Sequence, residues 1–206
     1  MDFSPDARMP PVAVIDFETT GTSPRCGARA TEIAAVLVDG GRIVDSFQSL
    51  MHSGARVPPF IERLTGISNA MLRRAPPAAD VMREVMRFTA GCPLVAHNAA
   101  FDRGFWTAEA ELAACAPDPA HAFACTLLLA RRVFPDAPDH KLGTLAAWQQ
   151  LPDSGRAHRA LADATTTAHL LLRLQDELQR RHGRAFDHAA LCRVQEGAQR
   201  TPRFRA

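Results

Sequence analysis

Three short stretches of the chain place carboxylates and a histidine where they could act together. Asp16 and Glu18 lie two residues apart in an apolar segment, so a β-strand would direct both side chains to one face. A second stretch ends at Asp102 and opens a helical segment. In the third, His158 precedes Asp163 by five residues, so both could face the start of one helix. The three stretches therefore offer four carboxylates and one imidazole to a common site.

Taken singly, each stretch also has a structural explanation. The pair Asp16 and Glu18 fits the solvated edge of a strand. Asp102 in a first helical turn would complement the helix dipole, and Asn98 could be a helix N-cap. A lone histidine such as His158 is more often a surface residue than a base. The combination of all three stretches is what favours a chemical site.

Four carboxylates brought together repel one another and raise one another's pKa unless divalent cations neutralise them. Oxygen ligands alone favour Mg²⁺ or Mn²⁺ over zinc. Two such ions about 4 Å apart can hold the attacking and leaving oxygens of a phosphodiester that is displaced by water. A neutral imidazole can accept the proton of that water, which is the role that the sequence leaves for His158.

The elements that must position these groups follow from hydrophobic periodicity. We expect an N-terminal meander of three antiparallel strands at 12–18, 33–38 and 43–50, with a turn at Asp39-Gly40-Gly41, and a short buried strand at 93–96. Apolar spacing predicts helices at 78–89, 101–112, 126–134, 142–150 and 160–182. The stripe on the second of these helices is Phe101, Phe105, Ala108 and Leu112. Strands followed by alternating helices and short strands indicate an α/β domain with a mixed sheet.

Composition limits the class of protein. The chain has 206 residues, 47% of them apolar and 22% charged, which excludes a chain that is disordered throughout. No apolar run approaches the length of a membrane span, and the N-terminus lacks a secretory signal pattern. Five scattered cysteines suggest a reducing cytosol and a cytoplasmic protein. We expect a flexible leader at 1–10, one domain at 11–180 and an Arg-rich C-terminal tail at 181–206.

Three motifs, in this order, resemble those of the DEDDh 3′→5′ exonucleases, and most closely those of the epsilon proofreading subunits of bacterial DNA polymerase III. They are Asp-x-Glu-Thr-Thr-Gly at 16–21, His-Asn-Ala-Ala-Phe-Asp at 97–102 and His-x-Ala-x-x-Asp-Ala at 158–164. The resemblance covers about residues 12 to 174. It implies a ribonuclease-H-like three-layer α/β fold with a five-stranded mixed sheet flanked by helices.

The resemblance also implies a role for each motif residue. Asp16, Glu18 and Asp163 would hold the metal ion that carries the nucleophilic water. Asp16 would bridge to a second Mg²⁺ or Mn²⁺ ion, which Asp102 would support. His158 would be the general base, and a chain without tyrosine cannot use the tyrosine that a sister group places there.

Substrate contacts are implied in the same way. Thr19 and Thr20 would touch the terminal nucleotide, partly through backbone N–H groups, and Asn98 would help to orient the strand. Thr65 and Ile67 belong to a stretch, 64–67, that is similar to the family's nucleotide-wedging segment. Many epsilon subunits have a histidine where Thr65 stands.

The function that follows is a two-metal 3′→5′ exonuclease acting on single-stranded 3′ ends, with DNA favoured over RNA, and releasing nucleoside 5′-monophosphates. A polymerase catalytic subunit is a possible partner, through a proofreading role. The alternatives are a stand-alone nuclease that trims RNA or DNA 3′ ends, and a non-catalytic nucleic-acid-binding module. A membrane is not an expected partner.

Overall fold

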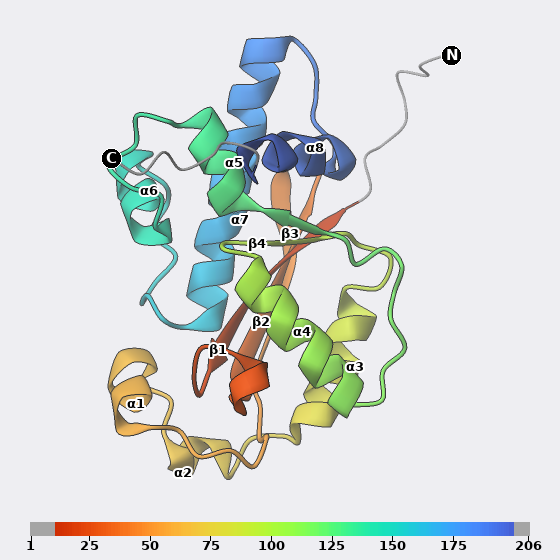
Figure 1. The fold of residues 1–206 in the computed structure, drawn as a ribbon, viewed down its shortest axis with the longest axis vertical. Helices are drawn as coiled ribbons and strands as arrows, with labels where there is room; N and C mark the ends of the chain where they lie inside the picture. The colour runs from red at the N-terminus through yellow and green to blue at the C-terminus, as the bar shows by residue number, and fades with distance from the viewer. Residues whose placement is uncertain (1–10, 200–206) are drawn as a thin grey trace.

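Five strands form one mixed sheet in the order β3-β2-β1-β4-β5 (Figure 1). In this computed structural model, which describes residues 11–199 and side chains up to residue 197, β1 is the central strand. It runs antiparallel to β2 and parallel to β4, while β3 and β5 are the edges. The bounds are Val12–Thr19 for β1, Ala30–Asp39 for β2, Arg42–Leu50 for β3, Leu94–Ala96 for β4 and Phe123–Cys125 for β5.

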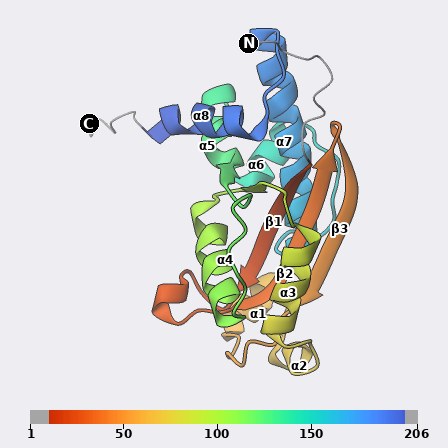
Figure 2. The same cartoon turned by 90° about the vertical axis from the view of Figure 1, so that its right-hand side faces the viewer.

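Helices cover both faces of the sheet and complete a three-layer fold. Figure 2 shows α3 in front of the strands and α7 behind them. On one face, α3 (Ala78–Phe88) and α4 (Ala100–Leu112) bury the side chains that β1 directs toward them. The other face is packed against α5 (Thr126–Val133), α6 (Leu142–Trp148) and α7 (Ala160–His182). The predicted meander, mixed sheet and five helices are therefore confirmed.

Three short helices lie near the lower end of the molecule in Figure 1. They are η1 (Pro24–Cys26), α1 (Pro59–Thr65) and α2 (Asn69–Leu72). Val57, Ile67 and Leu72 form a small apolar cluster of their own beneath α1 and α2. This lobe, residues 56–74, adjoins the loop before α7, because a Cβ atom on Gly66 would lie 2.8 Å from the Arg156 guanidinium.

The buried face of α4 is rotated relative to the predicted stripe. Leu112, expected in the core, is 62% exposed, whereas Asp102 and Glu109 are each 2% exposed. Glu109 receives two hydrogen bonds from the Arg29 guanidinium, at 2.8 and 2.9 Å, and one from the Ala30 N–H. The prediction was wrong here because two acidic residues occupy the inner face, which a count of apolar residues does not detect.

The C-terminal boundary also differs from the expected one. Residues 183–199 are not a tail, because α8 (His188–Gln199) packs Ala190 and Leu191 into the core. The side-chain amide of Gln195 donates to Phe123 O at 3.1 Å and accepts from Cys125 N–H at 2.6 Å. These are backbone groups of edge strand β5. The predicted leader at 1–10 and the last residues of the predicted tail, 200–206, lie outside the described residues.

No helix between residues 11 and 199 has both the length and the apolar character needed to cross a membrane.

Candidate active site

The C-terminal end of β1 carries the first two carboxylates on the face of the sheet that α7 covers. Val12 and Val14 point into the core on this face, and the period of two continues it through Asp16 and Glu18. Phe17 points the opposite way and packs against aromatic rings of α4. Glu18 is 9% exposed and Asp16 is half-buried. Apolar residues thus fix the strand, and its end presents two acids together.

The third carboxylate comes from the first turn of α4. Asp102 Oδ1 accepts a hydrogen bond from the Phe17 N–H at 3.1 Å, which ties the helix start to the middle of the Asp16–Glu18 pair. Asp102 is 2% exposed, and burial raises its pKa to about 7 although the Phe17 N–H acts in the opposite direction. This Asp102 is therefore part of the carboxylate cluster, and a role limited to the helix dipole does not account for its burial.

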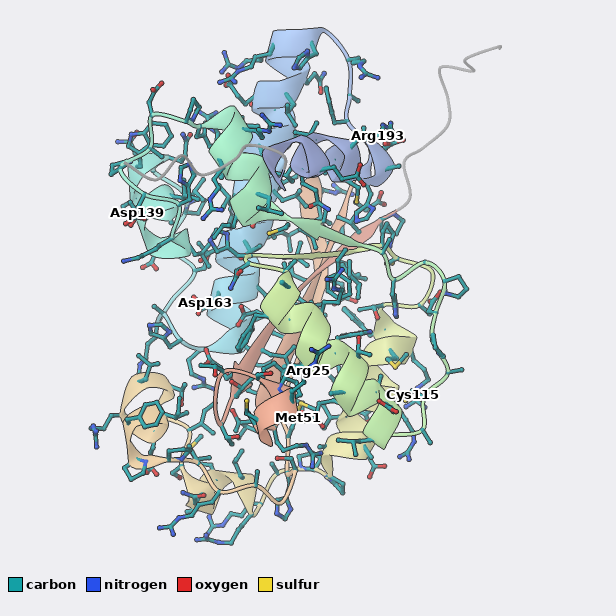
Figure 3. The ribbon with its side chains drawn as sticks, in the orientation of Figure 1. Arg25, Met51, Cys115, Asp139, Asp163 and Arg193 are labelled. Atoms are coloured by element: carbon teal, nitrogen blue, oxygen red, sulfur yellow. The ribbon has the colours of Figure 1, made fainter. Side chains whose placement is uncertain are left out.

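The fourth carboxylate and the histidine lie at the start of α7. Figure 3 shows Asp163 at the lower end of this helix. Asp163 Oδ2 accepts a hydrogen bond from the backbone N–H of His158 at 3.0 Å. His158 is exposed and has a left-handed backbone, with φ of 61°, which is unusual for a residue with a side chain. Ligand atoms of Glu18, His158 and Asp163 all lie within 4.8 Å of one another.

The electrostatics of the cluster are unfavourable without a cation. Burial raises the pKa of Asp16 well above its usual range, and the surrounding carboxylates raise it further; in order of effect they are Asp102, Asp163, Glu18 and Glu32. The pKa of Glu18 rises to about 8, mainly through burial and then through the charge of Asp163. Burial also raises the pKa of Asp163. Such crowding is relieved when divalent cations bind.

The donor set fits Mg²⁺ or Mn²⁺. Four carboxylates converge from one strand and two helices, which gives the all-oxygen ligands that these ions prefer. The histidine stands at the exposed edge of the group. A cavity of about 740 Å³ opens beside His158 and Asp163, with α6 forming its opposite wall. The group is therefore both suited to cations and open to solvent.

The threonines after Glu18 have internal hydrogen bonds. Thr19 Oγ1 donates to Gly21 O at 2.6 Å, and Thr20 Oγ1 accepts from the Arg29 N–H at 3.0 Å. The register of β1 and β2 shifts between Glu18 and Thr19 because Thr31 is an extra residue on β2, so β2 bends beside the site. Both threonines directly follow Glu18 in the chain.

Asn98 lies in the turn between β4 and α4. It is exposed and has φ of 61°, and the N-cap of α4 is Ala99 without a side-chain hydrogen bond. The N-cap alternative for Asn98 is therefore wrong. His97 before it is held in place, because its ring nitrogens lie 2.9 Å from Thr126 Oγ1 and 3.0 Å from His140 O.

The two predicted substrate contacts in the stretch 64–67 are buried. Thr65 is 1% exposed; its hydroxyl donates to Ile61 O and accepts from the Ile67 N–H. The Ile67 side chain is fully buried in the small cluster under α1. The neighbouring Leu64 is 47% exposed. In this stretch Leu64 is therefore the side chain available for contact.

Sequence reasoning did not identify the ion pair of Glu32 and Arg159. Glu32 is 1% exposed on β2, directly opposite Glu18, and Arg159 follows His158. The two residues are 127 positions apart, so no spacing rule connects them. The one available signal was an acid inside the apolar run of residues 30–38, because a buried acid requires a partner.

Comparisons with known proteins identify the family of the chain. The RNase_T family model, described as Exonuclease, matches residues 13–171. The chain is 38% identical over 171 residues to the 3′-5′ exonuclease DinG of Bacillus subtilis, covering 81% of this chain and 18% of that protein. It is 34% identical to DNA polymerase III subunit epsilon of Aquifex aeolicus, covering 89% of each.

A solved structure of exonuclease X in complex with 5′ overhanging duplex DNA has a TM-score of 0.68 and 26% identity, covering 89% of this chain and 99% of that one. The chain spans less than a fifth of DinG and of the PolC-type DNA polymerases III that it matches. The family model covers most of the described residues, and the epsilon relative is covered almost throughout. The ribonuclease-H-like fold is confirmed by these neighbours, and the chain belongs to the RNase_T exonuclease family.

Proposed function

We propose that the protein is a metal-dependent exonuclease that removes nucleotides from the 3′ end of single-stranded nucleic acid, DNA in preference to RNA. The observation that carries this proposal is the convergence of Asp16, Glu18, Asp102 and Asp163, with His158 at their exposed edge. A non-catalytic binding module would have no need of buried carboxylates whose pKa values are raised. The names of the relatives support the same reaction class.

The four carboxylates would hold two Mg²⁺ or Mn²⁺ ions, with Asp16, Glu18 and Asp163 at one and Asp102 and Asp16 at the other. Bound ions would supply charge neutralisation at the phosphate and a more acidic water. The protein's own contribution is orientation: β1 fixes two acids, α4 and α7 fix one each, and the Phe17 N–H holds Asp102. This rigid arrangement is what a hydrolytic site on a phosphodiester requires.

His158 is the group that would accept a proton from the attacking water. Its backbone N–H is held by Asp163, which leaves the imidazole free at the exposed edge of the cluster. A carboxylate bound to a cation is a weak base, so the imidazole has a role that the four acids cannot fill. His158 also adjoins the cavity of about 740 Å³, through which the products could leave.

The terminal nucleotide would lie between the Thr19–Thr20 segment and the lobe formed by residues 56–74. The exposed Leu64 side chain would contact a base, while buried Thr65 and Ile67 would support the backbone that presents it. Asn98 would help to orient the strand. Apolar contacts of this kind tolerate any base, which suits an enzyme that removes nucleotides in succession.

A proofreading partnership with a DNA polymerase catalytic subunit is the biological role we favour. The similarity to an epsilon subunit over 89% of both chains supports it. Stand-alone trimming of DNA or RNA 3′ ends is the competing role. Purification of the tagged protein from its native host separates them, since stable association with a polymerase catalytic subunit supports proofreading and a free monomer or homodimer supports trimming.

Activity is tested with single-stranded DNA, RNA and a mismatched primer end, each labelled at the 5′ end, in Mg²⁺ and in Mn²⁺. Progressive shortening from the 3′ end supports the proposal, and Asp16→Asn should abolish it. Asp80→Asn is the matched control, because Asp80 is an exposed acid on α3 that pairs with Arg83. Intact substrates under every condition would refute the exonuclease function.

A further inference from the structure

The N-terminus of α7 depends on the sheet for its anchor. Its N-cap is Arg159, which makes no side-chain capping hydrogen bond. The first free N–H of the helix, that of Ala160, donates instead to Glu32 Oε2 on β2 at 3.1 Å. A helix start without a local cap leaves its N–H groups unsatisfied, so the carboxylate of Glu32 acts as the cap from a different element.

Arg159 joins the same carboxylate through its guanidinium. Nε donates to Glu32 Oε2 at 3.1 Å and Nη2 donates to Oε1 at 2.7 Å, a two-point contact that fixes orientation as well as distance. Gln48 Nε2 on β3 donates to Oε1 at 2.7 Å. Glu32 is 1% exposed, and four hydrogen bonds fully occupy its two oxygens. We call Glu32, Arg159 and the Ala160 N–H the β2–α7 clamp.

The clamp lies between His158, in the loop before α7, and Asp163, in the first turn of α7. Arg159 follows His158 directly, and the Asp163 N–H donates to Arg159 O at 3.0 Å. The clamp therefore fixes the residue after the proposed base and the turn that carries Asp163. His158 itself is exposed and has a left-handed backbone, a conformation that persists only where the surroundings impose it.

We propose that Glu32 is a positioning residue, which acts through Arg159 and Ala160 to hold His158 in its catalytic orientation. Glu32 does not need to touch substrate or cation, because its oxygens are already taken by Arg159, Ala160 and Gln48. The structural half of this inference is that Glu32 holds the His158 segment in place. The activity half is that this hold is needed for catalysis, and only this half rests on the proposed exonuclease function.

The chain contains a matched control for the clamp. Glu109 on α4 is also a buried acid with a two-point contact to an arginine, Arg29, and it accepts the N–H of the next residue, Ala30. The Glu109 pair anchors the start of β2 rather than α7. Glu109→Gln therefore reproduces the loss of a buried carboxylate–arginine pair without touching the His158 segment.

Amide hydrogen exchange of the metal-free protein tests the structural half. In Glu32→Gln, exchange in residues 157–163 should accelerate about tenfold or more relative to wild type. In Glu109→Gln the same segment should exchange at the wild-type rate, even if both variants unfold at similar denaturant concentrations. Equal acceleration of this segment in the two variants would overturn the clamp.

A double-mutant cycle with His158→Ala tests the activity half. Glu32→Gln should lower kcat about 10- to 100-fold with little change in KM, but it should change the residual kcat of His158→Ala less than about threefold. Arg159→Lys, which retains the charge and loses the two-point contact, should show an intermediate loss. Independent, multiplying effects of the Glu32 and His158 changes would overturn the positioning role. A wild-type protein without nuclease activity would refute the proposed function, and the exchange comparison would still decide the clamp.

Discussion

Glu18 and Glu32 lie directly opposite each other on neighbouring antiparallel strands, yet their surroundings differ. Glu32 forms an ion pair with Arg159 at 2.7 Å, whereas Glu18 faces Asp163 and His158. The Arg159 charge reaches Glu18 as well and lowers its pKa, but burial and the nearby acids outweigh it. Of these two paired acids, Glu32 is thus neutralised by an arginine, whereas Glu18 is left to bind a cation.

The first prediction concerns the stability of the metal-free protein. The pKa of Glu18 is raised to about 8, so its ionisation costs folding free energy as the pH rises from its ordinary pKa to the raised one. Between pH 6.5 and 8 the free energy of unfolding should fall by about 1–2 kcal/mol. Urea titrations in a chelator measure this fall, and saturating Mn²⁺ should remove most of it.

Glu18→Gln provides the control for this pH effect. The variant should be more stable than wild type at pH 8 without metal, because a neutral amide replaces a carboxylate among like charges. It should also lose nuclease activity, an exchange of stability for function that is common at active sites. A variant with the wild-type slope between pH 6.5 and 8 would show that Glu18 is not the titrating group.

The second prediction concerns His97, whose ring is held between Thr126 Oγ1 and His140 O. Burial lowers its pKa to about 4, so the folded state holds the ring neutral while the unfolded chain takes up a proton below about pH 6.5. Its contribution to stability is therefore complete above about pH 6.5 and is lost as the pH falls toward 4, by up to about 3 kcal/mol.

Comparison of His97→Gln with His52→Gln isolates this contribution. His52 is an exposed histidine, and its replacement is the control for the loss of a histidine as such. His97→Gln should lower stability at pH 7 and reduce the further loss between pH 6.5 and 4. Parallel acid curves for wild type and His97→Gln would contradict the assignment.

The third prediction separates the two roles open to His158, base and cation ligand. His158→Ala should lower kcat by about 10²–10⁴-fold. Because all four carboxylates remain, the rise in Tm on addition of Mn²⁺ should be retained. Loss of this rise in Tm would make His158 a ligand rather than a base.

The fourth prediction contrasts two adjacent residues of the lobe at 56–74. Leu64→Ala should raise KM for single-stranded DNA about tenfold, since burial of a leucine side chain is worth about 1.5–3 kcal/mol, and should change stability by less than about 0.5 kcal/mol. Thr65→Val should instead cost about 1–3 kcal/mol of stability, because the Ile67 N–H loses its buried acceptor. Stability loss in Leu64→Ala without a change in KM would reassign that side chain to packing.

Hydrophobic periodicity was sufficient to predict the strands and helices that carry the site. The run at 12–18 and the helices at 126–134 and 160–182 lie within a few residues of β1, α5 and α7. These elements bury continuous apolar faces, and burial is what the pattern records. The four carboxylates lie at the ends of such elements and His158 lies in the loop before α7, while their catalytic roles stay predictions.

The other features of the fold and of the site could not be predicted from the sequence, for physical reasons. Strand β5 has three residues, which are too few to show an alternating apolar pattern. The inner face of α4 contains acids, and α8 binds the sheet through polar atoms of His188 and Gln195. The Thr65 hydroxyl bonds to nearby backbone groups, those of Ile61 and Ile67, and the sequence does not distinguish such a residue from one that contacts substrate. The inner face of α4 and the Thr65 turn are both fixed by hydrogen bonds, which apolar periodicity does not record.

The amide of Gln195 has a consequence for the behaviour of the protein in solution. It occupies backbone groups of β5 that would otherwise be free to pair with a strand of another molecule. Exposed sheet edges are sites of intermolecular association. Proteolysis between Gly183 and Asp187 would release α8 and bare both this edge and the apolar surface beneath Leu191. A protein shortened at this position should therefore self-associate. The twelve residues of α8 are expected to prevent this association by covering the edge of β5.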